Sequence, residues 1–167
     1  MKRYLLTLTF LLTGWALATL PKTEPLEGVS SLSNVISPYL EIQRALSQDK
    51  LTLIPSLLQN MDDQLKKLSS QPLNQQYQTL VKNLSTEIES FKKNTDPKLH
   101  RIKFGNISKL MIEYLKLHPK ETKTLQLFFC PMFPQGYAFW VQRQGETLAN
   151  PYWGHEMLEC GVKRPWK

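Results

Sequence analysis

The residues with the most distinctive chemistry are two cysteines and two methionines near the end of the sequence. Cys130 precedes Met132 by two positions, and Met157 precedes Cys160 by three. Thiolate and thioether sulfurs are soft, polarisable donors, so two Cys-plus-Met pairs suit Cu(I) better than a hard cation. These four residues form a candidate metal site, with Cu(I) as the expected ion.

The spacing within each pair lets both sulfurs point the same way. Side chains two positions apart in an extended segment project to one side, as expected for Cys130 and Met132. Side chains three apart in a helical turn are neighbours, as expected for Met157 and Cys160. Turn-forming residues flank both pairs and favour loops that bring the pairs together. They are Pro131, Pro134, Asn150, Pro151 and Gly154.

The same two cysteines have a second interpretation, a structural disulfide. Two cysteines in an exported chain most often pair with each other. A bridge from Cys130 to Cys160 closes a loop of about 30 residues. By reducing the entropy of the unfolded chain, such a bridge should stabilise the folded protein by about 3 to 4 kcal/mol. In that case Met132 and Met157 are core side chains. The residue types alone leave both the metal site and the disulfide open.

Two further residues lie near the sulfur pairs in the sequence. Trp140 could shield a soft cation or contact it through its π face, or it could simply pack the β-hairpin onto the helices. His155 could be an additional donor or could orient a metal ligand, or it could be an ordinary surface histidine. For each residue, both alternatives stay open.

Patterns typical of enzymes are absent from the sequence. It contains no Cys-x-x-Cys redox motif, no glycine-rich phosphate loop and no nucleophile elbow. His100, His118 and His155 are too far apart for a histidine zinc motif. Glu156 and Glu159 lie near the cysteines but lack an evident catalytic partner. We therefore expect a protein that is not an enzyme.

The N-terminal end has the pattern of a secretory signal. Lys2 and Arg3 precede an apolar run from 4 to 17, and Ala16-Leu17-Ala18 offers a cleavage site, so residues 1–18 are predicted to be a signal peptide. The alternative is an uncleaved anchor, but the apolar run is short for a membrane span. The mature protein is expected to be periplasmic or secreted and not membrane-spanning.

The charge of the chain does not indicate a nucleic-acid partner. The net charge is +7, and two of the positive charges lie in the predicted signal. The remaining lysines are spread along the chain, as in Lys66-Lys67 and Lys92-Lys93, and no stripe of arginine and aromatic residues occurs. A solvated helical surface explains this distribution, so we expect no nucleic acid as partner.

Four helices are predicted between residues 34 and 119, after a flexible leader over 19–33. Apolar residues recur there at spacings of three and four. Ser37-Pro38 is expected to begin the first helix. Pro55 is expected to kink or to begin the second, and Asp96-Pro97 to begin the fourth. Short links between the helices favour an up-down four-helix bundle.

Beyond residue 120 the apolar pattern changes to a period of two. Residues 124–129 and 137–142 are predicted strands of a small hairpin around the loop that contains Cys130. A lone hairpin is marginally stable in water, so its apolar side should pack on the helices. Residues 120–167 are thus a hairpin and Cys/Met region within the same domain, in a mainly α fold. The candidates for that apolar side are Leu125, Leu127, Phe139 and Trp140.

The C-terminal motifs resemble the signature of a domain of unknown function. That domain occurs alone in secreted proteins or at the C-terminus of periplasmic adaptor subunits of RND-type heavy-metal efflux systems. The resemblance covers about Val35 to Val162. It departs from the family pattern at Asp49-Lys50, where acidic residues are usual, and at His100, where Gln is usual. The matching motifs are Cys130-Pro131-Met132, Trp140, Asn150-Pro151-Tyr152 with Gly154, and Met157-Leu158-Glu159-Cys160-Gly161.

This resemblance implies a helical bundle that carries a small hairpin, in a heavy-metal and copper context. The resemblance does not imply an activity. Together with the four sulfur residues it leads us to expect a Cu(I) carrier, buffer or presenter linked to heavy-metal efflux, with a periplasmic efflux adaptor or another copper-handling protein as a candidate partner. The alternative is a disulfide-stapled interaction module of an efflux or envelope assembly that holds no metal.

Overall fold

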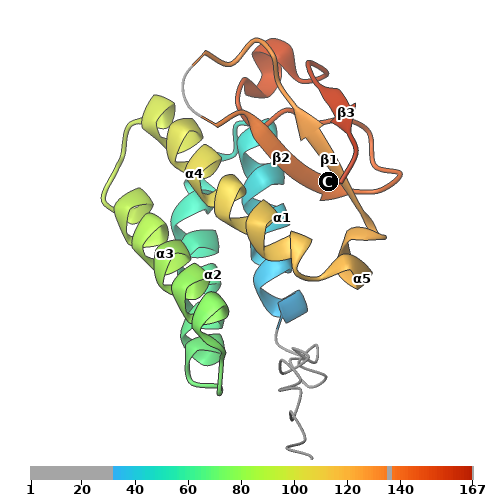
Figure 1. Ribbon diagram of the computed structural model, residues 1–167. Coiled ribbons are helices and arrows are strands. Elements are labelled where there is room, and N and C mark those ends of the chain that lie inside the picture. The colour runs from blue at the N-terminus through green and yellow to red at the C-terminus, as the bar shows by residue number, and fades with distance from the viewer. Residues whose placement is uncertain (1–31, 135–136, 167) are drawn as a thin grey trace, which may run out of the picture.

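The computed structural model describes residues 32–134 and 137–166, which form helices beside a small sheet (Figure 1). The predicted signal peptide, 1–18, lies outside these ranges, as does the predicted leader except for its last two residues. The described chain is mainly helical and carries a three-stranded antiparallel sheet toward its C-terminal end. The predicted class, mainly α with a small C-terminal β region, is confirmed.

Four long helices occupy the four predicted helical segments, and successive helices pack against one another. Their periodic apolar residues form the core; Leu84, Ile88 and Phe91, for example, are almost completely buried. No helix among the described residues is long and apolar enough to cross a membrane. The helices are α1 (Leu32–Ser47), α2 (Ile54–Ser69), α3 (Gln75–Lys92) and α4 (Pro97–Lys116).

The residues predicted to begin helices do so in α2 and α4, but not in α1. The Asp96 side chain caps α4 by accepting from the Lys98 N–H at 2.9 Å, and Pro55 lies in the first turn of α2. The predicted start of α1 at Ser37-Pro38 is wrong, because α1 begins at Leu32 and contains Pro38. Proline lacks an N–H and removes one helical hydrogen bond. Pro38 is itself buried, as are its helix neighbours Val35 and Tyr39. The packing of this face of α1 in the core therefore outweighs the loss of one backbone hydrogen bond.

The sheet contains the predicted hairpin and one additional strand. Strands β1 (Leu125–Phe129) and β2 (Phe139–Arg143) pair in antiparallel register, and β3 (Val162–Arg164) pairs with the other edge of β1. Phe128 lies opposite Trp140, and their rings stack with centroids 5.3 Å apart. No strand was predicted at the position of β3.

Strand β2 is held against α1 and α4, which lie beside the sheet, whereas α2 and α3 lie farther away (Figure 1). The Val141 backbone N–H donates to the Tyr39 hydroxyl of α1 at 3.0 Å, and that hydroxyl also bonds Ser108 of α4 at 2.9 Å. A Cβ on Gly105 of α4 would lie 2.5 Å from the Tyr137 carbonyl oxygen, so only glycine allows this approach. The predicted packing of the hairpin on the helices is confirmed.

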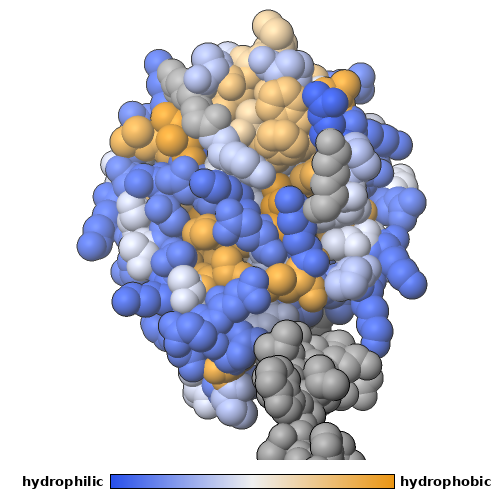
Figure 2. All heavy atoms as spheres, in the orientation of Figure 1, coloured by the Kyte–Doolittle hydropathy of each residue, from blue (hydrophilic) through white to orange (hydrophobic). Residues whose placement is uncertain are grey.

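Short helical segments complete the chain between these elements. They are η1 (Leu51–Leu53), α5 (Pro119–Thr122) and η2 (Gly154–Met157). Hydrophilic residues cover most of the face seen in Figure 2, and hydrophobic patches interrupt them at its upper end and across its middle. Both cysteines lie outside the strands, one after β1 and one before β3.

Candidate functional site

The loop after β1 and the segment before β3 bring the two cysteines together. Cys130 follows β1 directly, and Cys160 precedes β3 by two residues. Because β1 and β3 are antiparallel neighbours, the end of one lies beside the start of the other. The two Sγ atoms are 3.9 Å apart, and both thiols are free. Cys130 is fully buried, whereas Cys160 is partly exposed.

Backbone hydrogen bonds fix the main chain at each cysteine. The Cys130 N–H donates to the Ala138 carbonyl at 3.0 Å, which extends the β1–β2 pairing beyond Phe129. The Cys160 N–H donates to the Met157 carbonyl at 3.0 Å, which closes the turn expected between these two residues. The sulfurs are therefore placed by ordered backbone on both sides.

Asn150 connects the two cysteines through its side-chain amide. Its Nδ2 donates to Cys130 Sγ at 3.2 Å and to the Cys160 carbonyl at 2.6 Å. Its Oδ1 accepts from the Tyr152 N–H at 2.8 Å, and its own backbone N–H donates to the Leu158 carbonyl at 2.7 Å. The side chain is fully buried. The sequence predicted Asn150 only as a turn former, and its hydrogen bonds to both cysteines were not predicted, although its place in the C-terminal motif is a signal that could have indicated them.

The surroundings of Cys160 affect the protonation of its thiol. Burial raises the pKa of the Cys160 thiol, and the hydrogen bond and charge interaction with Cys130 raise it further. A metal ion bound at Cys160 must therefore displace a proton at neutral pH. The amide N–H of Asn150, directed at the Cys130 sulfur, is the kind of contact that stabilises a metal-bound thiolate.

The two predicted methionine ligands lie beside the thiols in the chain. Met132 is in the loop after Cys130 and is 56% exposed. Met157 ends η2, is half-buried, and is tied to Cys160 by the turn described above. Among the four predicted sulfur ligands, the contact that the structure shows is the one between Cys130 Sγ and Cys160 Sγ. Within residues 32–134 and 137–166, no three His, Cys, Asp or Glu side chains are grouped closely enough to hold a metal ion.

Trp140 packs next to the Cys160 backbone. Its ring is completely buried and meets the Tyr152 ring edge-on, with centroids 5.9 Å apart. A Cβ on Gly161 would lie 2.6 Å from the indole, so glycine at 161 allows the backbone after Cys160 to cross the ring closely. Trp140 is therefore packed against Tyr152 and against Gly161, the residue that follows Cys160.

His155 binds Asp49, which lies two residues after the end of α1. Its Nδ1 is 2.6 Å from Asp49 Oδ2, its backbone N–H donates to the same oxygen at 3.0 Å, and its side chain is 70% exposed. Asp49 is also bound by Arg101, which donates to the Leu46 and Pro151 carbonyls as well. We call Asp49, Arg101 and His155 the Asp49 latch.

The Asp49 latch holds the 150–155 segment against the end of α1. Asp49 has a positive φ of 54° and Gly154 a φ of 58°. A Cβ on Gly154 would lie 2.3 Å from the Asp49 carboxylate, so the contact requires glycine. Burial raises the pKa of Asp49, but the hydrogen bonds from His155 and the Arg101 guanidinium outweigh burial and lower it. No spacing in the sequence indicated this cluster.

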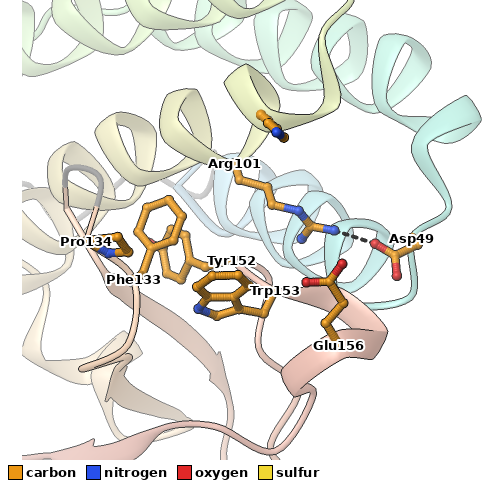
Figure 3. Close-up of a pocket in the computed structure, with 8 residues that line it drawn as sticks. Asp49, Arg101, Phe133, Pro134, Tyr152, Trp153 and Glu156 are labelled. Atoms are coloured by element: carbon orange, nitrogen blue, oxygen red, sulfur yellow. Dashed lines mark hydrogen bonds and ion pairs between the residues drawn. The ribbon is translucent and has the colours of Figure 1, made fainter.

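A cavity of about 450 Å³ lies between the Asp49 latch and the aromatic side chains of the cysteine loops. Figure 3 shows Phe133, Tyr152 and Trp153 on one side of it and the Arg101–Asp49 ion pair on the other. The Phe133 and Tyr152 rings stack with centroids 4.7 Å apart. Phe133 follows Cys130 by three residues in the loop after β1, whereas Tyr152 and Trp153 belong to the segment between β2 and β3 that contains Cys160. The same two segments therefore supply the aromatic wall and the thiols.

Comparisons of the chain with models of protein families, with curated proteins and with solved structures find no match. The functional argument therefore rests on the residues of this chain and on their geometry.

Proposed function

We propose that this protein is a periplasmic or secreted soft-metal-binding protein that holds Cu(I) between Cys130 and Cys160. The observation that carries the proposal is the pair of free thiols with sulfurs 3.9 Å apart. Two thiols held this close, with one of them partly exposed, offer a compact donor pair that an ion from solution can reach. It is not proposed to be an enzyme.

The distance between the thiols fits one shared ion. Metal–thiolate bonds are about 2.3 Å long in zinc sites, and two such bonds at a tetrahedral or trigonal angle separate their sulfurs by about 3.8 to 4.0 Å. The observed 3.9 Å lies within that range. Thiolate donors select soft ions, which favours Cu(I). Because the thiols must lose protons, binding should strengthen as pH rises.

Different residues would have different roles in holding the ion. Cys130 is buried and bonded by Asn150, so it is the anchoring ligand, and the more exposed Cys160 is the ligand through which the ion is taken up or released. Met132 and Met157 are the proposed additional donors; Met132 is exposed enough to present the ion to a partner. Trp140 covers the inner side of the site.

The resemblance of the Cys/Met motifs supports a place in heavy-metal efflux. The proposed role is a Cu(I) carrier, buffer or presenter whose partner is a periplasmic efflux adaptor or another copper-handling protein. We further propose that α1 to α4 form an up-down four-helix bundle, which serves as the rigid platform for the sheet and the cysteine loops. The packing of successive helices supports that arrangement.

The same thiol pair also favours a second candidate, a disulfide-stapled interaction module without metal. In a disulfide the two sulfurs lie about 2 Å closer together than the 3.9 Å that separates them here. In that case oxidation would staple the loop after β1 to the segment before β3, and the protein would dock onto an efflux or envelope assembly through its surface.

Native mass spectrometry separates the two candidates. The protein is purified anaerobically, reduced or oxidised, and mixed with one equivalent of Cu(I). The proposal predicts one copper on the reduced protein and none on the oxidised protein or on Cys130→Ser, with Met61→Leu as a control that removes a buried sulfur of α2 far from the site in the sequence. A reduced protein that takes up no copper would favour the stapled module.

A further inference from the structure

The cavity beside the Asp49 latch combines aromatic rings with charged side chains, and none of the four sulfur residues is among the described residues that line it. Its volume of about 450 Å³ is within the usual range for small-molecule sites. The charged side chains of its wall are two acidic and two basic ones: Asp49, Glu156, Lys98 and Arg101. We call this cavity the latch cavity.

Arg101 and Asp49 are already engaged with each other and with the surrounding chain. Arg101 donates to Asp49 and to the carbonyls of Leu46 and Pro151. Asp49 accepts from the His155 backbone N–H as well, at 3.0 Å. Figure 3 shows this ion pair on the side of the cavity opposite the rings. Because the two charges neutralise each other, the pair presents no net charge to a ligand.

The other two charged side chains, Lys98 and Glu156, are not engaged in this way. Both residues are exposed, and both line the latch cavity. Within the parts of the chain that the structure describes, neither side chain has an ion-pair or hydrogen-bond partner. Lys98 comes from the first turn of α4 and Glu156 from η2. The described wall therefore offers a ligand one unpaired charge of each sign.

Phe133 and Trp153 give the latch cavity an aromatic surface. Both residues are half-buried and line the cavity. Their ring planes are nearly perpendicular, at 87°, with centroids 6.4 Å apart. The Phe133 ring is held by Tyr152, which stacks on it with centroids 4.7 Å apart. The ring of a ligand can therefore pack against an aromatic surface that is already in place.

We propose that the latch cavity binds a free α-amino acid with an aromatic side chain. The carboxylate of the ligand pairs with Lys98 and its ammonium group pairs with Glu156. Its ring packs against Phe133 and Trp153. A zwitterion suits this wall, because Glu156 would repel an anion and Lys98 would repel a cation. The end of a peptide is a poorer match, since it carries only one of the two charges that a free amino acid carries.

L-phenylalanine and three analogues test which groups the latch cavity recognises. L-phenylalaninamide lacks the carboxylate and resembles the first residue of a peptide, 3-phenylpropanoate lacks the ammonium group, and L-alanine lacks the ring. Each is titrated into reduced, copper-free, isotope-labelled protein and followed by ¹H–¹⁵N NMR. We expect phenylalanine to bind with a Kd in the millimolar range and each analogue to bind at least about threefold more weakly. The resonances that move should belong to the residues of the cavity wall.

Two substitutions and two matched controls assign the charges. Lys98→Gln should remove the difference in affinity between phenylalanine and its amide, and Glu156→Gln the difference between phenylalanine and 3-phenylpropanoate. Lys109→Gln, also on α4, and Glu159→Gln, three residues after Glu156, lie outside the cavity and should preserve both differences. All four residues are exposed, so each variant should stay folded.

The proposal is overturned if phenylalanine causes no saturable change, if any analogue binds as tightly as phenylalanine, or if Lys98→Gln or Glu156→Gln preserves the difference that it should remove. Saturable changes confined to residues outside the latch cavity would also overturn it. Equal binding of phenylalanine and its amide would indicate a peptide end as the ligand instead. These outcomes do not depend on the proposed metal site, because the titrated protein holds no copper.

Discussion

At the scale of single residues, Asn150 is the side chain on which the geometry of the cysteines depends most. It bonds the Cys130 sulfur, the Cys160 carbonyl and the Tyr152 N–H from a fully buried position. A buried polar group that loses its partner retains the full cost of its desolvation. The effect of removing Asn150 should therefore exceed that of removing an exposed asparagine.

We predict that Asn150→Ala lowers the free energy of unfolding by about 2 to 4 kcal/mol, because two backbone groups and one thiol lose their partner. Urea denaturation followed by circular dichroism measures this change. Asn83→Ala, exposed on α3, is the control and should change stability by less than about 0.5 kcal/mol. Equal stability of the two variants would contradict the role given to Asn150.

Gly154 offers a second residue-scale test, with Gly145 as its matched control. Both have positive φ, but a Cβ at 145 meets nothing within 4 Å, whereas one at 154 meets the Asp49 carboxylate at 2.3 Å. Gly145→Ala should cost only the backbone strain, about 1 kcal/mol. Gly154→Ala should cost about 2 to 4 kcal/mol, because it also displaces the Asp49 latch. Thermal unfolding checks this, and similar costs for the two variants would show that the latch is not packed against 154.

The Asp49 latch also predicts a dependence of stability on pH. Hydrogen bonds from His155 and Arg101 lower the folded-state pKa of Asp49 below its ordinary value of 3.8. A depressed pKa stabilises the folded state above the ordinary value and loses that contribution as pH falls through the folded pKa. Asp49→Asn should therefore be more destabilising at pH 7 than at pH 3. Denaturation curves at both pH values measure it, and an equal effect at both would rule out the ionised latch.

At the scale of elements, the sequence predicted the helices and strands whose apolar pattern lies within their own residues. The helical period located α2, α3 and α4, and the alternation of apolar residues located β1 and β2. The strand β3 has only three residues, all exposed, and its pairing depends on the already formed edge of β1. Such a strand has no signal of its own in the sequence.

Other features escaped prediction because they depend on distant contacts. The start of α1 was misplaced because a proline is usually found in the first turn of a helix, and here core packing keeps Pro38 inside it. Asp49, Arg101 and His155 are separated by about fifty residues each, so only the folded chain reveals their cluster. The cysteine pair was foreseen as two residues that converge, but its link through Asn150 was not.

The apolar stripe of α3 gives the prediction at this scale. Ile88 is completely buried, so Ile88→Asp places an unpaired charge in the core and should destabilise the fold by more than about 4 kcal/mol. Asn83→Asp introduces the same carboxylate on the exposed side of the same helix and should be nearly neutral. Far-UV circular dichroism at 25 °C checks both. A folded Ile88→Asp protein with an unchanged melting curve would refute the assigned core.

At the scale of the whole molecule, the helices support the sheet and the sheet supports the cysteine loops. The buried apolar residues of α1 to α4 form one core with those of the sheet and with Cys130. Because most of that core lies within the helices, we expect the helices to stay folded when the two thiols change their bonding. By linkage, an ion that binds the dithiol form protects the thiols from oxidation, and oxidation expels the ion. The proposed copper function and the disulfide are therefore competing states of one pair of sulfurs.

The most direct test of the central claim is a competition titration of the protein against a Cu(I) chelator. The reduced protein should bind Cu(I) at least about 100-fold more tightly than the oxidised protein, and Cys130→Ser or Cys160→Ser should nearly abolish binding. Met132→Leu and Met157→Leu should each weaken it by a smaller step, because thioethers are neutral and weaker donors. Equal affinity of the reduced and oxidised forms, or no response to any of the four substitutions, would contradict the metal site.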